Sequence, residues 1–243
     1  MSRVTYDAGN LTIGLEGLDD VAAALGNLRK KTPAAAKVAI NTTARQARQL
    51  MIARARARYA VNAAGQRHLK DLKMTGKGHP ATNRNLEAVL YISKMRNDLG
   101  YFQHRPTQTF TGPIVAADVL HLYVPAFVKA RVLKESNMEP LTGTAHLSKG
   151  FLVEFKSGHV GMVQRVIGSS SHNTVTQKSG APRWRNAAGN VEKLQTMGSP
   201  SATAMHNVVW PMVEPEVEDM LHANLQAQVE RIIARETAKR GRK

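Results

Sequence analysis

Nine histidines are the side chains best suited to acid–base chemistry or metal binding, and they are scattered singly along the 243-residue chain. None is followed by another histidine four positions later, and HExxH is absent, so the spacing gives no helical zinc site. The chain has no cysteine, which removes thiol nucleophiles, disulfides and Cys-ligated metal centres. The residue types therefore predict no metal site.

Short glycine-containing stretches match known motifs by their letters alone. Residues 76–81 read GxGxxA, but no buried strand precedes them, and Pro80 stands where a dinucleotide fingerprint needs a helix start. Lys178-Ser179-Gly180 resembles one box of the serine penicillin-recognising enzymes, but the accompanying SxxK is missing. Walker A and GxSxG motifs are also absent. We therefore expect no catalytic residues, no cofactor and no enzyme activity.

The charge of the chain points to an anionic partner. Thirty-four basic residues against 18 acidic ones give a net charge of +16, which suits nucleic acid, a membrane surface or an acidic protein. From Val21 to Lys70 there is no acidic residue, whereas a solvated helix usually mixes charge signs. We expect this basic helix to meet negative charge supplied by another molecule. Its candidate interface or DNA-facing residues are Lys37, Arg45, Arg48, Arg54, Arg56 and Arg58.

Three interpretations of the basic helix stay open: a phosphate-binding face, an interface with an acidic protein, and a solvated face, which is the weakest. No zinc finger or RNP box indicates base-specific recognition. A further candidate is Arg183-Trp184-Arg185, in which Trp184 could stack on bases between two cations. The favoured alternative is that Trp184 anchors its loop on the body of the protein or on a neighbouring subunit.

The elements that would position these residues predict an α+β fold. We expect a long basic N-terminal helix and a C-terminal amphipathic helix, packed on a small antiparallel sheet with a hairpin. Thr32 is the expected N-cap of the basic helix, Pro33 its first residue and Ala60 its approximate end. The other expected elements are strands at 11–15, 86–92 and 119–124, a capped helix from Asp19 or Asp20, a short helix at 63–72, a hairpin at 151–166, a short helix at 201–210 and a final helix after Pro215.

These elements are grouped as one compact domain with extensions. The expected segments are 1–31 (strand and helix), 32–72 (basic helices), 73–166 (β-rich core), 167–200 (extended loop or insertion) and 201–243 (helix with basic tail). No apolar run is long enough to span a membrane, and the N-terminus lacks a signal-peptide layout. We therefore expect a soluble protein that is made in a cytoplasm.

Three stretches resemble the minor tail protein Z family of tailed phages, the tail completion proteins, and more distantly the head–tail connector proteins of long-tailed phages. The first is Leu15-Glu16-Gly17-Leu18-Asp19-Asp20 with the Ala/Arg-rich helix from Ala34 to Tyr59. The second is Gly150-Phe151-Leu152-Val153 with residues 158–165, similar to the family hairpin "F…G-H-x-G-V-F-x-R". The third is the turn from Leu194 to Ser201, similar to "L-x-G-P-S".

The resemblance implies a structural virion protein without enzyme activity. Such proteins act at the head-proximal end of the tail, in the neck, so that a finished tail joins a filled head. The implied partners are the tail terminator, the tail tube and head-completion proteins, in a homo-oligomeric ring, with non-specific DNA contact and no membrane. Charge reversal at Arg45 and Arg48 is then expected to abolish joining and leave the monomer folded. The alternative function is non-sequence-specific nucleic-acid binding through the basic helix.

Overall fold

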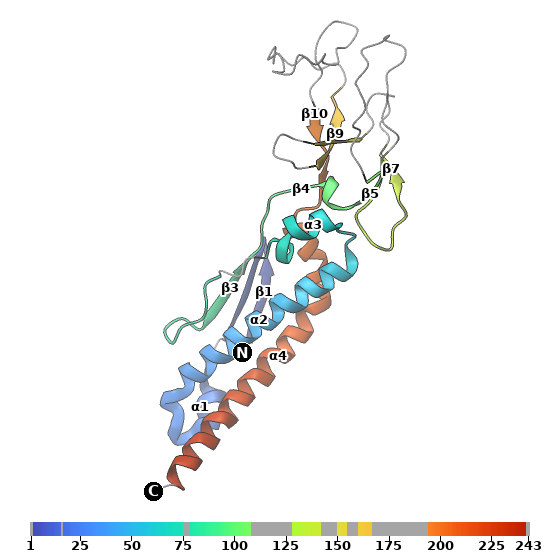
Figure 1. Cartoon of the computed structure of the whole chain (residues 1–243). Coiled ribbons are helices and arrows are strands. Elements are labelled where there is room, and N and C mark those ends of the chain that lie inside the picture. Colours follow the sequence, from blue (N-terminus) through green and yellow to red (C-terminus); the bar gives the residue numbers. More distant parts are fainter. Residues whose placement is uncertain are drawn as a thin grey trace, which may run out of the picture. The chain divides into compact units, whose positions relative to one another are not determined.

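The computed structural model describes residues 2–15, 17–74, 78–107, 128–141, 150–154, 160–166 and 194–241 (Figure 1). They form the expected α+β fold of long helices and small antiparallel sheets. The chain divides into two compact units, whereas one compact domain with extensions was expected. The helical unit comprises Met1–Ala57, Leu69–Met95 and Pro200–Lys243, and the β unit comprises Arg58–His68 and Arg96–Ser199. The expected β-rich core at 73–166 is therefore shared between the two units.

The helical unit contains a sheet of β1 (Ser2–Asp7), β2 (Asn10–Leu15) and β3 (Glu87–Tyr91), antiparallel in that order. Alternate residues of β2 are buried, with Leu11 opposite Leu90 and Ile13 opposite Ala88. The strands expected at 11–15 and 86–92 are confirmed. β1 was not predicted; it joins β2 through a turn in which Gly9 has a φ of +91° and its Cα faces Thr203.

The N-terminal helices are α1 (Asp19–Leu25), the 3₁₀ helix η1 (Gly26–Lys31) and α2 (Thr32–Arg58). Gly26 ends α1 with a φ of +51°. α2 is the predicted basic helix, but Thr32 is not its N-cap, because the chain enters from η1 and Thr32 is already helical. The Oγ1 atom of Thr32 is buried without a hydrogen-bond partner in the described structure.

The C-terminal helix α4 runs without interruption from Ala202 to Arg240, capped by Ser201, whose Oγ accepts from the backbone N–H of Ala204 at 3.1 Å. The prediction of one helix that ends at Trp210 and another that starts after Pro215 is wrong. Pro211 and Pro215 both lie on the exposed side of α4, so the carbonyls that lose a helical donor are on the solvent side.

α2 and α4 run antiparallel in the helical unit (Figure 1). Lys31, just before α2, pairs with Glu236 near the end of α4. Further along, Asn224 Nδ2 donates to Thr43 Oγ1 at 2.9 Å. α1 closes this end, where Val21 and Leu25 form an apolar cluster with Val229. The sheet that accompanies these helices is β1–β2–β3, whereas the predicted hairpin at 151–166 belongs to the β unit.

The described residues of the β unit form three small antiparallel sheets. Their orders are β5–β6–β7, β10–β9–β8 and β11–β4. The elements are α3 (Ala63–His68), β4 (Asn97–Asp98), the 3₁₀ helix η3 (Leu99–Tyr101), β5 (Gln103–Arg105), β6 (Lys129–Arg131), β7 (Glu139–Pro140), β8 (Phe151–Glu154), β9 (Val160–Arg165), β10 (Leu194–Thr196) and β11 (Gly198–Ser199). The pairing of β8 with β9 confirms the hairpin. The strand expected at 119–124 and the loop expected at 168–190 lie outside the described residues.

Asn62 connects α3 to η3 and to Phe102, the residue after η3, within the β unit. Its Nδ2 donates to the carbonyls of Gly100 at 2.7 Å and Phe102 at 2.8 Å, and its Oδ1 accepts from the N–H of Gly65 at 2.8 Å. Phe102 is fully buried. One amide side chain therefore satisfies three backbone groups where the chain leaves α2 and turns into α3.

Candidate interaction surfaces

α2 is a helix because Pro33 is followed by an alanine-rich run without an internal glycine or proline. Small residues let one side of it pack closely; Ala36, Ala39, Ala47 and Ala55 are fully buried. The six predicted basic residues of α2 do not form one face. At about 100° per residue, Arg45, Arg48 and Arg56 fall on one side, and Arg54 and Arg58 on another.

Arg48 binds acceptors of its own chain. Its Nη2 donates to Asp71 Oδ2 at 2.7 Å and to the carbonyl of Met74 at 3.2 Å, while its Nε is buried without a partner in the described structure. Arg56 Nη2 lies 3.9 Å from Asp71 Oδ1. Asp71 belongs to the short 3₁₀ helix η2 (Lys70–Lys73), directly after the acid-free span.

The segment that Arg48 holds is strained. Asp71 and Leu72 have φ values of +53° and +50°, in the left-handed region that costs non-glycine residues on the order of 1–3 kcal/mol each. Contacts from Arg48 to Asp71 itself and to the carbonyl of Met74, two residues beyond Leu72, stabilise the strained conformation. Arg48 is therefore a structural residue of the helical unit.

Replacing Arg48 by methionine is expected to lower the free energy of unfolding by about 2 kcal/mol, because a charged hydrogen bond is lost and Asp71 keeps its strained backbone. Arg45→Met is the matched control, since Arg45 is exposed and donates only to Thr42 Oγ1 at 3.2 Å; we expect a change within about 0.5 kcal/mol. Urea unfolding of both variants tests this. Equal effects would contradict the structural role of Arg48.

Arg54 also finds an acid within the chain. Its Nη2 lies 3.8 Å from Glu216 Oε2 of α4, and both side chains are half-exposed, so this ion pair is weak. Together with Asp71, Glu216 supplies negative charge to the basic helix. The expectation that all of this charge comes from another molecule is therefore corrected for Arg48, Arg54 and Arg56.

The remaining candidates are placed as follows. Lys37 is half-buried, and Arg45 is exposed. Arg58 is exposed at the end of α2 and belongs to the β unit. Burial raises the pKa of the neighbouring Tyr59, and the guanidinium of Arg58 opposes this rise in part. Arg183, Trp184 and Arg185 lie outside the described residues, so the structure does not bear on them.

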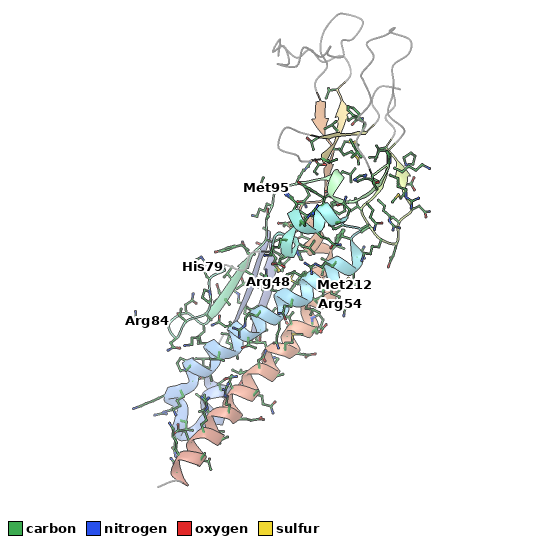
Figure 2. All side chains as sticks on the ribbon, viewed as in Figure 1. Arg48, Arg54, His79, Arg84, Met95 and Met212 are labelled. Carbon is green, nitrogen blue, oxygen red and sulfur yellow. The ribbon has the colours of Figure 1, made fainter. Side chains whose placement is uncertain are left out.

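α4 carries an exposed apolar face that the sequence analysis did not identify. Val208 is 45% exposed and Met212 59% exposed, and Ala204, Pro211 and Pro215 are exposed beside them at helical spacing. No Lys, Arg, Asp or Glu occurs between Ala202 and Val213. In Figure 2, Met212 lies with Arg54 at the edge of the helix pair turned away from β3. We call these five residues the α4 face.

The β unit has a hollow of about 420 Å³ beside α3 and β4. The ring of His68 stacks on Tyr101 there, with centroids 4.2 Å apart. Burial raises the pKa of Tyr101, and the charge of Asp98 raises it further. Asp98 Oδ1 accepts from the N–H groups of Gly100 at 2.7 Å and Met162 at 3.0 Å. This carboxylate therefore holds the backbone of η3 and β9 in place.

His206 is a buried titratable residue that the sequence analysis left unassigned. It lies on α4, is completely buried, and neither ring nitrogen has a hydrogen-bond partner of normal geometry in the described structure. Burial lowers its pKa to about 4, an effect that the backbone of Leu72 opposes in part. A neutral imidazole in an apolar core fits a packing role.

Within the described residues, none of the helices combines the length and apolar character needed to cross a membrane. No group of three or more histidine or carboxylate side chains could hold a metal ion in the same part of the chain. No protein-family model, curated protein or solved structure matches this sequence. The function is therefore argued from the surfaces described above and from the resemblance of the sequence.

Proposed function

We propose that this protein is a structural virion protein of a tailed phage, which completes the tail at its head-proximal end and is needed for head–tail joining. The resemblance to the minor tail protein Z family supports this role. The first of its three stretches includes the long helix α2, and the second includes the paired strands β8 and β9. The protein would then reside in the tail or neck of the virion, and in the host cytoplasm during assembly.

The α4 face is the observation that carries a docking role. Large contiguous apolar patches on a protein surface mark interaction sites, and buried apolar anchors supply most of the energy of an interface. Glu214 lies within the span of the α4 face, and Glu216, Glu218 and Asp219 follow it; together they are the densest acidic cluster in the sequence of a chain with net charge +16. The partner that fits is a tail or neck protein whose apolar surface is bordered by basic side chains.

The double variant Val208→Asp/Met212→Asp tests this role in phage that carry the gene. Placing two charges in an apolar interface is expected to weaken docking about 1,000-fold, so filled heads and finished tails accumulate unjoined. Infectious titre and electron microscopy of the particles measure the effect. Circular dichroism of the purified variant checks that it is folded, because both side chains are exposed in the free protein.

Val38→Asp is the matched control, since Val38 is an exposed valine on α2, 37% exposed, outside the α4 face. It is expected to leave joining unchanged. Wild-type titre from the double variant, or an equal loss with Val38→Asp, would contradict docking through the α4 face. Charge reversal at Arg45 alone is the suitable test of the basic helix, because reversal at Arg48 would also disturb the fold.

The alternative, non-sequence-specific nucleic-acid binding through the basic helix, has less support. Arg48, Arg54 and Arg56 each lie within 4 Å of a carboxylate of their own chain. A cation that already has an acid partner releases fewer counterions on binding phosphate. Among the described residues of α2, the exposed cations without such an acid partner are Arg45 and Arg58.

A further inference from the structure

The two-stranded ribbon of β5 and β6 in the β unit has one buried side and one basic side. His104 and Ala130 are in register and buried, and the adjacent register pair, Arg105 with Lys129, is exposed. Because side chains alternate across a strand, both cations stand on the same side of the ribbon. Arg131, two residues beyond Lys129, stands on that side as well. We call Arg105, Lys129 and Arg131 the ribbon face.

The two exposed cations of the ribbon face are directly opposite each other. Side chains in this relation have Cβ atoms about 5 Å apart, and like charges there destabilise the pairing. No ion pair joins Arg105 or Lys129 to an acid in the described part of the chain. Glu139 of β7 is in register with Ala130, so it belongs to the opposite side of the pleat. Within the described residues, two like charges thus stand together without an acid between them.

The third cation is fixed in place by hydrogen bonds. Arg131 Nε donates to Gln103 Oε1 at 2.7 Å, and its Nη1 donates to the carbonyl of Lys134 at 3.0 Å. A guanidinium that is already held loses less conformational entropy when it binds an anion. The ribbon face therefore combines a preorganised arginine with two cations whose repulsion a bound anion would remove.

We propose that the ribbon face binds the phosphate backbone of nucleic acid. Phosphate contacts use Arg, Lys and amide side chains, and the ribbon offers all three. The amide is that of Gln103, which is in register with Arg131 and two residues before Arg105. A protein partner needs apolar anchors, and none of the large exposed apolar side chains of the described chain lies on β5, β6 or β7. Spacing of about 7 Å between alternate residues of a strand matches a chain of phosphates, and the binding carries no base specificity.

This proposal is independent of the docking role of the α4 face, which lies in the other unit. Its test is the salt dependence of binding of the full chain to a fluorescent duplex DNA of arbitrary sequence, followed by anisotropy. The slope of log affinity against log salt changes by about 0.9 for each phosphate contact. Arg105→Gln/Lys129→Gln is therefore expected to reduce the slope by about 2. The control Arg29→Gln/Lys30→Gln removes two exposed cations of η1 and is expected to leave the slope unchanged.

A second measurement separates binding from structural support. Lys129→Glu replaces the repelling pair with an ion pair opposite Arg105, so the melting temperature of the free protein is expected to rise by about 1–3 °C. The same variant is expected to bind DNA more weakly than wild type. If Arg105 and Lys129 merely stabilise the ribbon, Lys129→Glu would lower the melting temperature. That result would overturn the proposal.

Two further outcomes would overturn it. If the control variant reduces the salt slope as much as the ribbon variant does, the affinity for DNA depends on the net charge of the protein. The ribbon face is then not a specific phosphate-binding site. Poly-L-glutamate serves as a competing anion at equal charge concentration. If the ribbon variant loses more affinity for poly-L-glutamate than for DNA, the face binds acidic protein instead of phosphate.

Discussion

Replacing Gly65 by alanine is expected to destabilise the β unit by about 3 kcal/mol or more. A Cβ atom at this position would lie 2.1 Å from the carbonyl oxygen of Tyr101 and 2.7 Å from Cγ1 of Val61. The first neighbour is backbone, so relief requires α3 and η3 to move apart, and Asn62 would lose its contacts with both. Inserting atoms into closely packed regions costs about 1–3 kcal/mol, and more where backbone must shift.

Thermal unfolding followed by circular dichroism measures this effect. Gly198→Ala is the control, because it makes the same substitution in the same unit, where the nearest atom to the new Cβ is Arg96 Cδ at 3.7 Å. We expect Gly198→Ala to unfold at the temperature of the wild type. A Gly65→Ala protein that unfolds like Gly198→Ala would show that α3 and η3 do not approach as closely as described.

Local sequence patterns predicted most elements of the described fold. α2 was predicted because its residues favour helix throughout, and β2 because its apolar residues alternate. β3 was predicted from a short apolar run, and β8 and β9 from two strand-like runs that flank a turn. The break assigned to α4 came from its prolines. The pattern that should have overruled them is the buried series Met205, Val209, Val213, Val217 and Leu221, which continues at a spacing of four through both prolines.

The same spacing of four explains why Ile233, further along α4, is exposed. Steps of four residues on a helix rotate by about 40° each, so a strict series drifts away from one face. Val217 and Leu221 are fully buried, and Val229 is 9% exposed, but Ile233 is 41% exposed. Ile233 is therefore exposed although it continues the spacing of four, and this drift can be calculated from the sequence.

The surroundings of the candidate residues could not be predicted from the sequence. Asp71 pairs with Arg48 because a strained turn brings it back to α2, and Glu216 pairs with Arg54 from more than 150 positions away. Neither contact leaves a periodic pattern in the sequence. The register of Arg105 with Lys129 is equally hidden, because it depends on the pairing of strands from separate parts of the chain.

His206 makes the protein sensitive to acid. Above pH 6.5 its imidazole is neutral in both the folded and the unfolded chain, so it contributes no pH dependence. Below pH 6.5 the unfolded chain takes up a proton that the folded chain, with a pKa of about 4 at this residue, does not. Stability is therefore lost as the pH falls from 6.5 toward 4, by about 2 kcal/mol at pH 5.

His206→Met is expected to remove this loss. Methionine has a similar volume, suits a helix interior and brings no buried nitrogen without a partner, so stability at pH 7.5 should stay equal or increase. Urea unfolding at pH 7.5 and pH 5 gives the free energy of unfolding for each protein. The wild type should lose about 2 kcal/mol more than the variant between these two conditions.

Met205→Leu separates titration from packing, because Met205 is the fully buried neighbour of His206 on α4 and does not titrate. Its effect on stability should be the same at both pH values, since neither folded nor unfolded chain changes its proton uptake at that position. If the wild type and His206→Met lose equal stability between pH 7.5 and 5, the imidazole already carries a proton or reaches water in the folded chain. In that case the complete burial of His206 would be wrong, and with it the continuous packing of α4 across its two prolines.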